Sequence, residues 1–561
     1  MKTKVLKLVA LFAALIMALN IMAGCGSTSG DKTSDAETSS KATTPAEETK
    51  DAKDPAQDTT PITLKVFLKN ELNWDTPVGR EITKKTGITL DFVPIAGDAQ
   101  EKLNLMLASN DMPDIVSIDR WSDANSKYIK SKAVIPLDDL MEKYGPNVKS
   151  QLGDTLKKVL NEDGHLYGIP SWFSSEVQPS PVFGFLIRMN YVKELGYYEK
   201  YTSKGYFTKD EFLSLLKDWK AKYPNINGKD TLPVTINQDN YSGARYTFMG
   251  MYAIGSYYEQ DGKLRDNVYN PAYKEMFMFM NQLYREGLLD KDWPVNKTAL
   301  WNEKMSNGYV LCAPDAYWNA GANSVLAKDA NGNETPDNMF YPFKVVADGV
   351  DPQKTTYGPT SVLGWLFTYI TSANKYPERT MKFLDYLISE EGQYITQWGP
   401  EGLFWEMKDN QRTIKEDCLE ELKKDFWTAI GDNGIRKYEI VFKSGIAQDG
   451  KPYDLWAEYS QNYGTKDPVA EFAKQYLGDS AWDTTLYDNL GPAAGTPEAL
   501  ISTKISDIGK NMEPKIILAK TQEEASQLYD QMVADMEKAG LAKVEEIVNA
   551  NFAKKKELWG N

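Results

Sequence analysis

The chain has 561 residues, of which 42% are hydrophobic and 12% aromatic, and its formal net charge is −15. This length allows two or more domains with full-sized cores. The acidic balance argues against nucleic acid and anionic lipid as primary partners, because both require a basic surface. The single histidine, His165, excludes a histidine-rich zinc site and leaves one residue for any Ser-His-Asp or Cys-His mechanism.

The first 25 residues have the pattern of an export signal. Three lysines precede an apolar run, 8–19, that is too short to be a stable membrane-spanning helix. The segment ends in Met22-Ala23-Gly24-Cys25, which resembles the lipobox of bacterial lipoproteins, in which the thiol takes a diacylglycerol. We predict a signal peptide at 1–24, lipidation of Cys25 and anchoring at the extracellular face of the cell membrane. The alternative is an ordinary secretory signal with a chance cysteine.

A polar segment follows the predicted lipidation site. Residues 26–60 contain no Val, Ile, Leu, Met or aromatic residue, so they cannot bury a core. We predict that 25–60, with the lipidated cysteine, is a disordered tether. Removal of the three lysines of 1–24 would change the net charge from −15 to −18. After Cys25 the chain has only two more cysteines, Cys312 and Cys418. Two cysteines do not make a disulfide framework, although the sequence leaves open whether these two form one disulfide bond.

Strands and helices alternate from residue 61 onward. The patterns predict strands at 64–68, 88–93 and 115–118, with helices at 77–87 and 99–108 between them. This spacing indicates a parallel α/β sheet. Ligands of such sheets bind beyond the carboxyl ends of the strands, so the rule nominates 70–74 and 119–121.

Later segments carry clear helix signals. Thr208 and Glu211 form a capping box that opens a helix to about 222, and an apolar face repeats from 276 up to Gly287. Thr521 and Glu524 begin a further helix that ends at Gly540, and another apolar face follows it.

Several motifs resemble a known family. Residues 103–116, 135–140 and 143–146 look like the extracellular solute-binding proteins of carbohydrate-type ABC importers, and more narrowly like the LipO-like lipoproteins of Gram-positive bacteria. Further segments match in the order in which the family has them, namely 163–170, 186–196, 375–392 and 398–402.

The resemblance implies a fold class. It is an α/β fold, a two-lobed periplasmic-binding-protein-like clamp with mixed, mainly parallel sheets flanked by helices and a hinge that the chain crosses three times. By analogy with the family, lobe one holds 61–187 plus about 360–395, and lobe two holds 188–359 plus 396–561. The two carboxyl-terminal helices should then pack on lobe two.

A sugar site needs flat aromatic side chains beside groups that satisfy hydroxyls. The aromatic candidates, each in a Gly, Pro or Asn-rich setting or at a strand end, are Trp74, Trp121, Trp172, Trp318, Trp365 and Trp398. The polar candidates are Asn70, Asp119, Arg188, Asp315 and Glu401. Trp121, Trp172 and Trp318 are favoured because the family's cleft is lined at the matching positions. The alternatives are core or surface positions for the Trp residues, and salt bridges or turn caps for the polar residues.

No pattern points to a metal, a cofactor or catalysis. Relatives carry a calcium loop at the position of 223–230, but this chain lacks its first Asp and much of its charge, so we predict no metal while structural calcium stays open. The glycines form no nucleotide-binding pattern, so we expect no cofactor. Paired carboxylates could make a glycoside hydrolase, but no motif favours one, and His165 is expected to be solvated.

We therefore predict a membrane-anchored, monomeric receptor, not an enzyme. It would capture an oligosaccharide or glycan fragment and deliver it to the permease subunits of an ABC importer, with no nucleic-acid partner. The alternative is a receptor for a short peptide or peptide-like signal, and a glycan-cleaving enzyme ranks third. The identity, length and linkage of the ligand depend on cleft geometry that distant segments build together.

Overall fold

The computed structural model describes residues 59–70, 72–95, 97–161, 163–175, 182–463 and 467–560. They contain two main sheets, each packed in its own hydrophobic core. We call the part around the first sheet lobe one and the part around the second lobe two. The predicted signal peptide, Cys25 and all but the last two residues of the predicted tether lie outside the described residues.

The first sheet has the strand order β2-β1-β3-β16-β4. Its strands are β1 (Ile62–Phe67), β2 (Ile88–Phe92), β3 (Ile115–Asp119), β4 (Gly168–Ser171) and β16 (Leu366–Ile370). β1 pairs in parallel with β2 and β3, whereas β16 is antiparallel to both β3 and β4. In this sheet β16 thus runs antiparallel to the direction of the other four strands. The three predicted strands of this region are confirmed within one or two residues at each end.

Lobe-one helices begin and end at the predicted signals. Thr76 caps α2 (Pro77–Thr86) by accepting a hydrogen bond from the Gly79 amide, and Gly87 ends it with φ 72°, which favours glycine. The other helices and the remaining hairpin of lobe one are α3 (Ala99–Ser109), α4 (Ala124–Lys130), α5 (Asp138–Tyr144), α6 (Pro146–Leu152), α14 (Pro377–Ile388), α15 (Glu390–Trp398), β17 (Trp405–Lys408), β18 (Gln411–Ile414), α16 (Leu419–Lys424), α17 (Phe426–Asp432) and α18 (Leu455–Asn462).

The second sheet has the strand order β13-β5-β12-β9. Its strands are β5 (Phe183–Arg188), β9 (Leu232–Val234), β12 (Val310–Ala316) and β13 (Phe340–Phe343). β5 is antiparallel to both β12 and β13, and β12 is parallel to β9. Again a single strand runs against the others, so both sheets are mixed.

Lobe-two helices confirm the capping predictions. The capping box of Thr208 and Glu211 opens α9 (Lys209–Lys222) and Thr521 caps α21 (Gln522–Ala539). The other elements are α7 (Met189–Glu194), α8 (Tyr198–Thr202), β6 (Phe207–Thr208), β7 (Asn225–Ile226), β8 (Lys229–Asp230), α10 (Tyr241–Met251), β10 (Tyr258–Gln260), β11 (Lys263–Arg265), α11 (Pro271–Arg285), α12 (Thr298–Ser306), α13 (Asn323–Leu326), β14 (Val345–Val346), β15 (Gly358–Thr360), α19 (Pro468–Leu477), β19 (Ala481–Asp483), α20 (Pro497–Ile517) and α22 (Leu541–Trp559).

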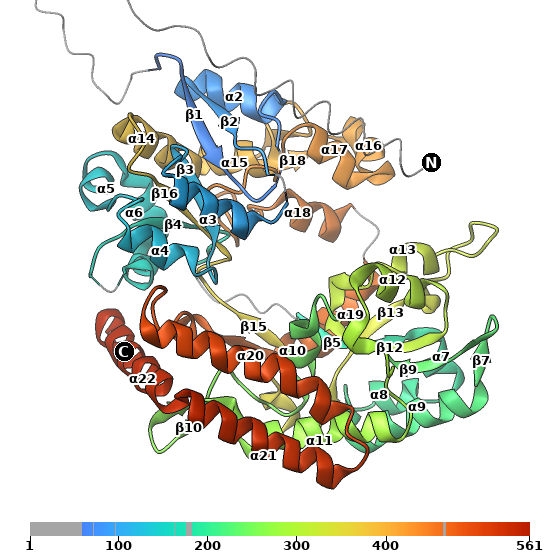
Figure 1. Ribbon diagram of the computed structural model, residues 1–561. Coiled ribbons are helices and arrows are strands. Elements are labelled where there is room, and N and C mark those ends of the chain that lie inside the picture. The colour runs from blue at the N-terminus through green and yellow to red at the C-terminus, as the bar shows by residue number, and fades with distance from the viewer. Residues whose placement is uncertain are drawn as a thin grey trace, which may run out of the picture. The chain divides into compact units, whose positions relative to one another are not determined.

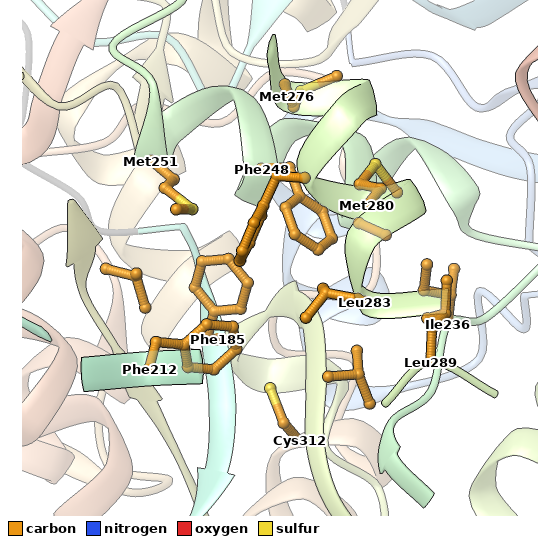
Figure 2. Close-up of a cluster of buried hydrophobic side chains, with 14 of the residues drawn as sticks. Phe185, Phe212, Ile236, Phe248, Met251, Met276, Met280, Leu283, Leu289 and Cys312 are labelled. Atoms are coloured by element: carbon orange, nitrogen blue, oxygen red, sulfur yellow. The ribbon is translucent and has the colours of Figure 1, made fainter. Parts of the chain in front are cut away.

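The core of lobe two is aromatic and rich in methionine. Figure 2 shows Phe185, Phe212 and Phe248 together, with Met276 and Met280 of α11 close by. Cys312 is fully buried in this cluster, and burial raises the pKa of its thiol well above the usual value. Cys418 lies beside the lobe-one core, and both thiols are free, so the disulfide left open by the sequence is not formed.

The carboxyl-terminal helices pack on lobe two, as predicted. Ala525, Met532 and Met536 of α21 join the same core as Phe277 and Met280 of α11. Figure 1 shows α20, α21 and α22, coloured red, with α21 beside α11. Apolar residues spaced three or four apart are what places one face of each helix in this core.

Membership of the two cores shows that the chain passes between the lobes three times. Lobe one contributes core residues between 64 and 173 and between 370 and 459, and lobe two between 185 and 357 and between 469 and 541. The chain therefore changes core between 173 and 185, between 357 and 370 and between 459 and 469, and β15, which belongs to the second of these segments, lies between the two sheets in Figure 1.

The third crossing differs from the predicted boundary. We had assigned all of 396–561 to lobe two, but Trp398, Trp405 and Tyr459 are buried in the lobe-one core. Apolar side chains of this segment suit either core equally well. The packing of α14 on β16, and of α15 on α14 and α2, assigns them to lobe one.

Candidate functional site

The first sheet brings several predicted residues to one edge. Leu366, the first residue of β16, pairs with Asp119 at the end of β3 and with Ser171 at the end of β4. Because β16 runs against its neighbours, its beginning meets their carboxyl ends. The side chains just beyond these ends are Asn70, Asp119, Trp121, Trp172 and Trp365, all of them predicted. The strand-end rule had nominated Asn70, Asp119 and Trp121, whereas Trp172 and Trp365 were predicted separately as aromatic candidates.

Two indoles form a stacked pair at this edge. The ring centroids of Trp172 and Trp365 are 5.0 Å apart, with 21° between their planes. Trp172 is only 7% exposed and has φ 64°, and its amide donates to the Phe442 carbonyl. Trp365 is 36% exposed. The pair thus has a fixed inner ring and an outer ring that solvent can reach.

Arg436 extends the aromatic row. Its guanidinium carbon lies 5.0 Å from the ring centroid of Trp172 and 5.1 Å from that of Trp427, which is 52% exposed. Arg436 Nε lies 2.9 Å from Asp454 Oδ1, which holds the guanidinium between the two rings. Sequence reasoning missed Arg436 and Trp427, because they come from the 426–442 segment, which we had assigned to lobe two.

A carboxyl group lies beside the stacked indoles. Desolvation raises the pKa of Glu439, and this is opposed by the positive charges of Lys69 and Arg436 and by the indole groups of Trp172 and Trp365. Glu439 and Asn70 line a small hollow between the ends of β1 and β16. Lys69 also pairs with Asp119 at 3.1 Å. In the sequence, Glu439 could have been predicted only from its position as the single charged residue of the apolar run 438–442.

The second sheet also has a carboxylate and exposed aromatic side chains at the edge that adjoins the crossings. Asp315 pairs with Gly184 near the start of β5, so it lies at the end of β12 that adjoins the first crossing. Asp315 Oδ1 accepts hydrogen bonds from Asn240 at 2.7 Å, Asn319 at 3.0 Å and the Ala316 amide at 2.7 Å. Its Oδ2 is buried without a partner in the part of the chain that the structure describes. Burial raises the pKa of this carboxyl to about 6.

Aromatic side chains accompany Asp315. Trp318, which follows β12, is 59% exposed. The Tyr317 ring packs edge-on against it, with the two ring centroids 4.9 Å apart. Tyr246 of α10 is 40% exposed and stacks on Phe183 with centroids 5.3 Å apart. We predicted Trp318 and Asp315 but missed Tyr246 and Asn240, because α10 reaches this edge only through the packing of lobe two.

Four predicted residues are not at these edges. Trp74 and Trp398 are buried in the lobe-one core, where their indole N–H groups donate to Thr83 Oγ1 and to the Pro452 carbonyl. Glu401 accepts from the Met407 amide in a turn, and Arg188 lies at the far end of β5, buried against Tyr191 and Phe340. These placements correct the prediction, because Gly-rich and Pro-rich neighbourhoods mark turns as readily as sites.

A larger cavity of about 730 Å³ lies where lobe one meets the carboxyl-terminal helices of lobe two. Trp121, which is 62% exposed, lines it and is the one predicted residue that does. Arg120 lies over the Trp121 ring with its guanidinium carbon 4.6 Å from the centroid, and it pairs with Asp488 from lobe two. The cavity therefore has walls from both lobes.

The family is shown by comparison with known sequences. A sequence profile described as bacterial extracellular solute-binding protein matches residues 78–400, more than half of the chain. The chain belongs to this family. The predicted resemblance is thereby confirmed.

Two relatives are known by name. The fructooligosaccharide ABC transporter substrate-binding protein FusA of Streptococcus pneumoniae is 28% identical over 359 residues, which cover 60% of this chain and 61% of FusA. Lipoprotein LipO of Bacillus subtilis is 26% identical over 351 residues, which cover 61% of this chain and 66% of LipO. The chain thus spans just under two thirds of each relative.

Solved structures confirm the fold of this solute-binding protein. An HMO-binding, ABC-transporter-associated solute-binding protein from Bifidobacterium longum infantis has a TM-score of 0.64 at 18% identity, covering 89% of this chain and 99% of that one. The predicted two-lobed, periplasmic-binding-protein-like α/β clamp is therefore correct.

Within the described ranges, no three His, Cys, Asp or Glu side chains lie close enough together to hold a metal ion, and none of the helices there is long and apolar enough to cross a membrane. The 223–230 segment forms the tight β7-β8 hairpin, with Asn227 and Gly228 at positive φ. His165 is exposed beside Asp138 at 3.1 Å. The expectation that no metal or cofactor is needed stays a prediction.

Proposed function

We propose that this protein is a lipid-anchored receptor that captures an oligosaccharide between its lobes and delivers it to the permease of an ABC importer. FusA and the Bifidobacterium protein are named for binding fructooligosaccharides and HMO, and LipO is named a lipoprotein. The anchor itself rests on the Met22-to-Cys25 motif.

One observation carries the proposal. The stacked Trp172 and Trp365 with Glu439 lie at the lobe-one edge, and Trp318 with Asp315 lies at the lobe-two edge, next to the same crossings. Aromatic faces bind the apolar face of a sugar ring, and carboxylates accept hydrogen bonds from its hydroxyls. Such a set suits a neutral or polar glycan held from both sides.

The three crossings supply the mechanism. Contacts from both lobes form together only when the lobes close on the ligand, so binding favours a closed state that a permease can distinguish. We propose that lobe one consists of 61–175 and 366–463 and lobe two of 182–357 and 467–560, with the segments between them acting as the hinge. Captured ligand would leave the protein unchanged, because the role is binding and not cleavage.

The test is a thermal-shift screen of the purified protein against oligosaccharides and short peptides. We expect a glycan to raise Tm, to bind in titration calorimetry, to reduce the radius of gyration in solution scattering and to be recovered intact. Stabilisation by peptides alone would favour a peptide receptor. A ligand that is shortened during incubation would favour an enzyme.

A further inference from the structure

Arg120 is a buried cation at a point where the two lobes meet. It follows the last residue of β3 in lobe one and is 2% exposed. Its guanidinium forms an ion pair with Asp488 of lobe two, whose side chain is 12% exposed. Burial of an arginine carries a large desolvation cost, so a partner must compensate its charge. For Arg120 that partner comes from the other lobe.

Arg120 also holds the backbone of the segment 358–365, which we call the second crossing. The Arg120 amide donates to the Trp365 carbonyl at 2.8 Å, and Arg120 Nε donates to the Gly364 carbonyl at 2.9 Å. Gly364 has φ 62°, and a Cβ there would lie 2.1 Å from the Ser171 carbonyl oxygen, so glycine is required. Arg120 thus fixes the backbone that carries the outer ring of the stacked indole pair.

The other half of the second crossing is fixed to lobe two. β15 pairs in parallel with β19, and the Thr484 amide donates to the Thr360 carbonyl at 2.7 Å. The Val362 amide donates to Thr485 Oγ1 at 3.1 Å. Leu363 therefore separates the bonds to lobe two from the bonds that Arg120 makes within lobe one. The pivot at this crossing is short, and the Arg120–Asp488 ion pair lies beside it.

Three more hydrogen bonds join lobe one to the loop that precedes α20. Asn489 Nδ2 donates to the Arg120 carbonyl at 3.2 Å. The Ala494 amide donates to Ser126 Oγ of α4 at 3.2 Å, and Lys130 Nζ donates to the Ala494 carbonyl at 3.2 Å. Each of these bonds has one partner in each lobe, so it exists only while the lobes are together on this side.

α22 fixes this loop to lobe two. Asn551 Nδ2 donates to the Leu490 carbonyl at 3.0 Å, and Lys555 Nζ donates to the Asp488 carbonyl. A movement of lobe two relative to lobe one would therefore carry Asp488 with it and break the ion pair with Arg120. A buried ion pair is weak evidence for stability by itself, whereas one that spans two lobes depends on their separation.

We propose that Arg120 is a positioning residue for ligand capture, which ties the second crossing and Trp365 to Asp488 of lobe two and so stabilises the closed arrangement of the lobes. This inference rests on the proposed function, since it concerns closure on the same ligand. Arg120 acts through Trp365 and Asp488 and needs no ligand contact of its own. The tie reduces the free energy that a ligand must supply for closure, so its loss weakens affinity.

The first experiment needs no ligand. Solution scattering gives the radius of gyration of the purified protein and of its variants Asp488→Asn, Arg120→Gln and Arg120→Gln/Asp488→Asn. We expect a larger radius in each single variant and no further increase in the double variant, because both single changes break the same tie. The control Arg265→Gln breaks an ion pair of 2.9 Å with Glu545 that lies within lobe two, so the radius should stay unchanged.

The second experiment measures affinity by titration calorimetry. The probe is the oligosaccharide that raises Tm most in the thermal-shift screen of the unmodified protein. We expect Asp488→Asn and Arg120→Gln each to bind it about tenfold more weakly, and the control Arg265→Gln to bind it as the unmodified protein does. Circular dichroism and Tm show which variants fold. If Arg120→Gln does not fold, Asp488→Asn decides the test, because its side chain is less buried.

The outcomes separate the tie from the receptor function. An unchanged radius of Asp488→Asn, with only a lower Tm, would reduce the ion pair to a structural role and overturn the inference. Tighter binding by this variant would overturn it as well, because the ion pair would then favour open lobes. If no oligosaccharide binds the unmodified protein, the proposed function fails, whereas the radii still decide whether Arg120 and Asp488 tie the lobes together.

Discussion

Trp172 and Trp365 stack with their centroids 5.0 Å apart, yet they differ fivefold in exposure, at 7% and 36%. The inner ring contacts Phe442 and Arg436 as well as its partner. The outer ring presents its free face to solvent. We therefore expect Trp172 to contribute mainly to stability and Trp365 mainly to ligand binding.

Substitution of each ring separates these roles. We expect Trp365→Ala to weaken glycan affinity by about 1 to 3 kcal/mol with little change in Tm, because the partly exposed ring that the ligand would contact is lost. Trp172→Ala should cost about 3 to 5 kcal/mol of folding free energy, as for other buried Trp residues. Calorimetric titration and urea unfolding measure the two quantities. Unchanged affinity of Trp365→Ala would remove this ring from the site.

Trp318 and Trp398 form a second contrast, between an exposed and a core position. Trp318 is 59% exposed at the lobe-two edge, whereas Trp398 is fully buried with its N–H bonded to the Pro452 carbonyl. We expect Trp318→Ala to lower affinity by about 1 to 3 kcal/mol and Trp398→Ala to lower stability by about 3 to 5 kcal/mol. Folded Trp398→Ala should bind normally. The reverse pattern would contradict our assignment.

Asp315 should make stability depend on pH. Burial raises its pKa from 3.8 to about 6, so the folded protein binds this proton more tightly than the unfolded chain does. The corresponding stability is fully present below about pH 4 and is lost as the pH rises through about 6. Two pKa units amount to about 3 kcal/mol.

Asp315→Asn removes this titration. We expect a higher Tm at pH 7.5, a flatter Tm profile between pH 4 and 6, and glycan affinity weakened by about 1.5 kcal/mol, because a charged acceptor is replaced by a neutral one. Differential scanning calorimetry across this pH range is the measurement. A Tm profile that matches the unmodified protein would show that Asp315 titrates normally.

The proposed anchor depends on a single thiol, that of Cys25. Cys25→Ser should leave the protein without lipid and release most of it from cells, since only the thiol accepts the diacylglycerol. Detergent partition and blotting of the culture medium test this, with Cys418→Ser as a control. A Cys25→Ser protein that stays in the detergent phase would rule out the lipoprotein assignment.

Local signals along the chain determined many features of this protein. Caps such as Thr208 with Glu211, the glycine at 87 and the apolar periodicity of α11 and α21 act within a few residues, so they could be predicted without the fold. The strand-end rule likewise nominated Asp119 and Trp121, because it depends only on where the strands end.

Tertiary structure alone decided the rest. Trp74 and Trp398 stand in the same sequence settings as Trp365 and Trp318, but contacts from distant segments bury the first two and leave the others exposed. Glu439, Arg436 and Asn240 became site candidates, and the larger cavity acquired its walls, through packing across more than 70 residues of sequence. Burial is a property of all the segments that surround a side chain, whereas propensity and capping depend on its immediate neighbours.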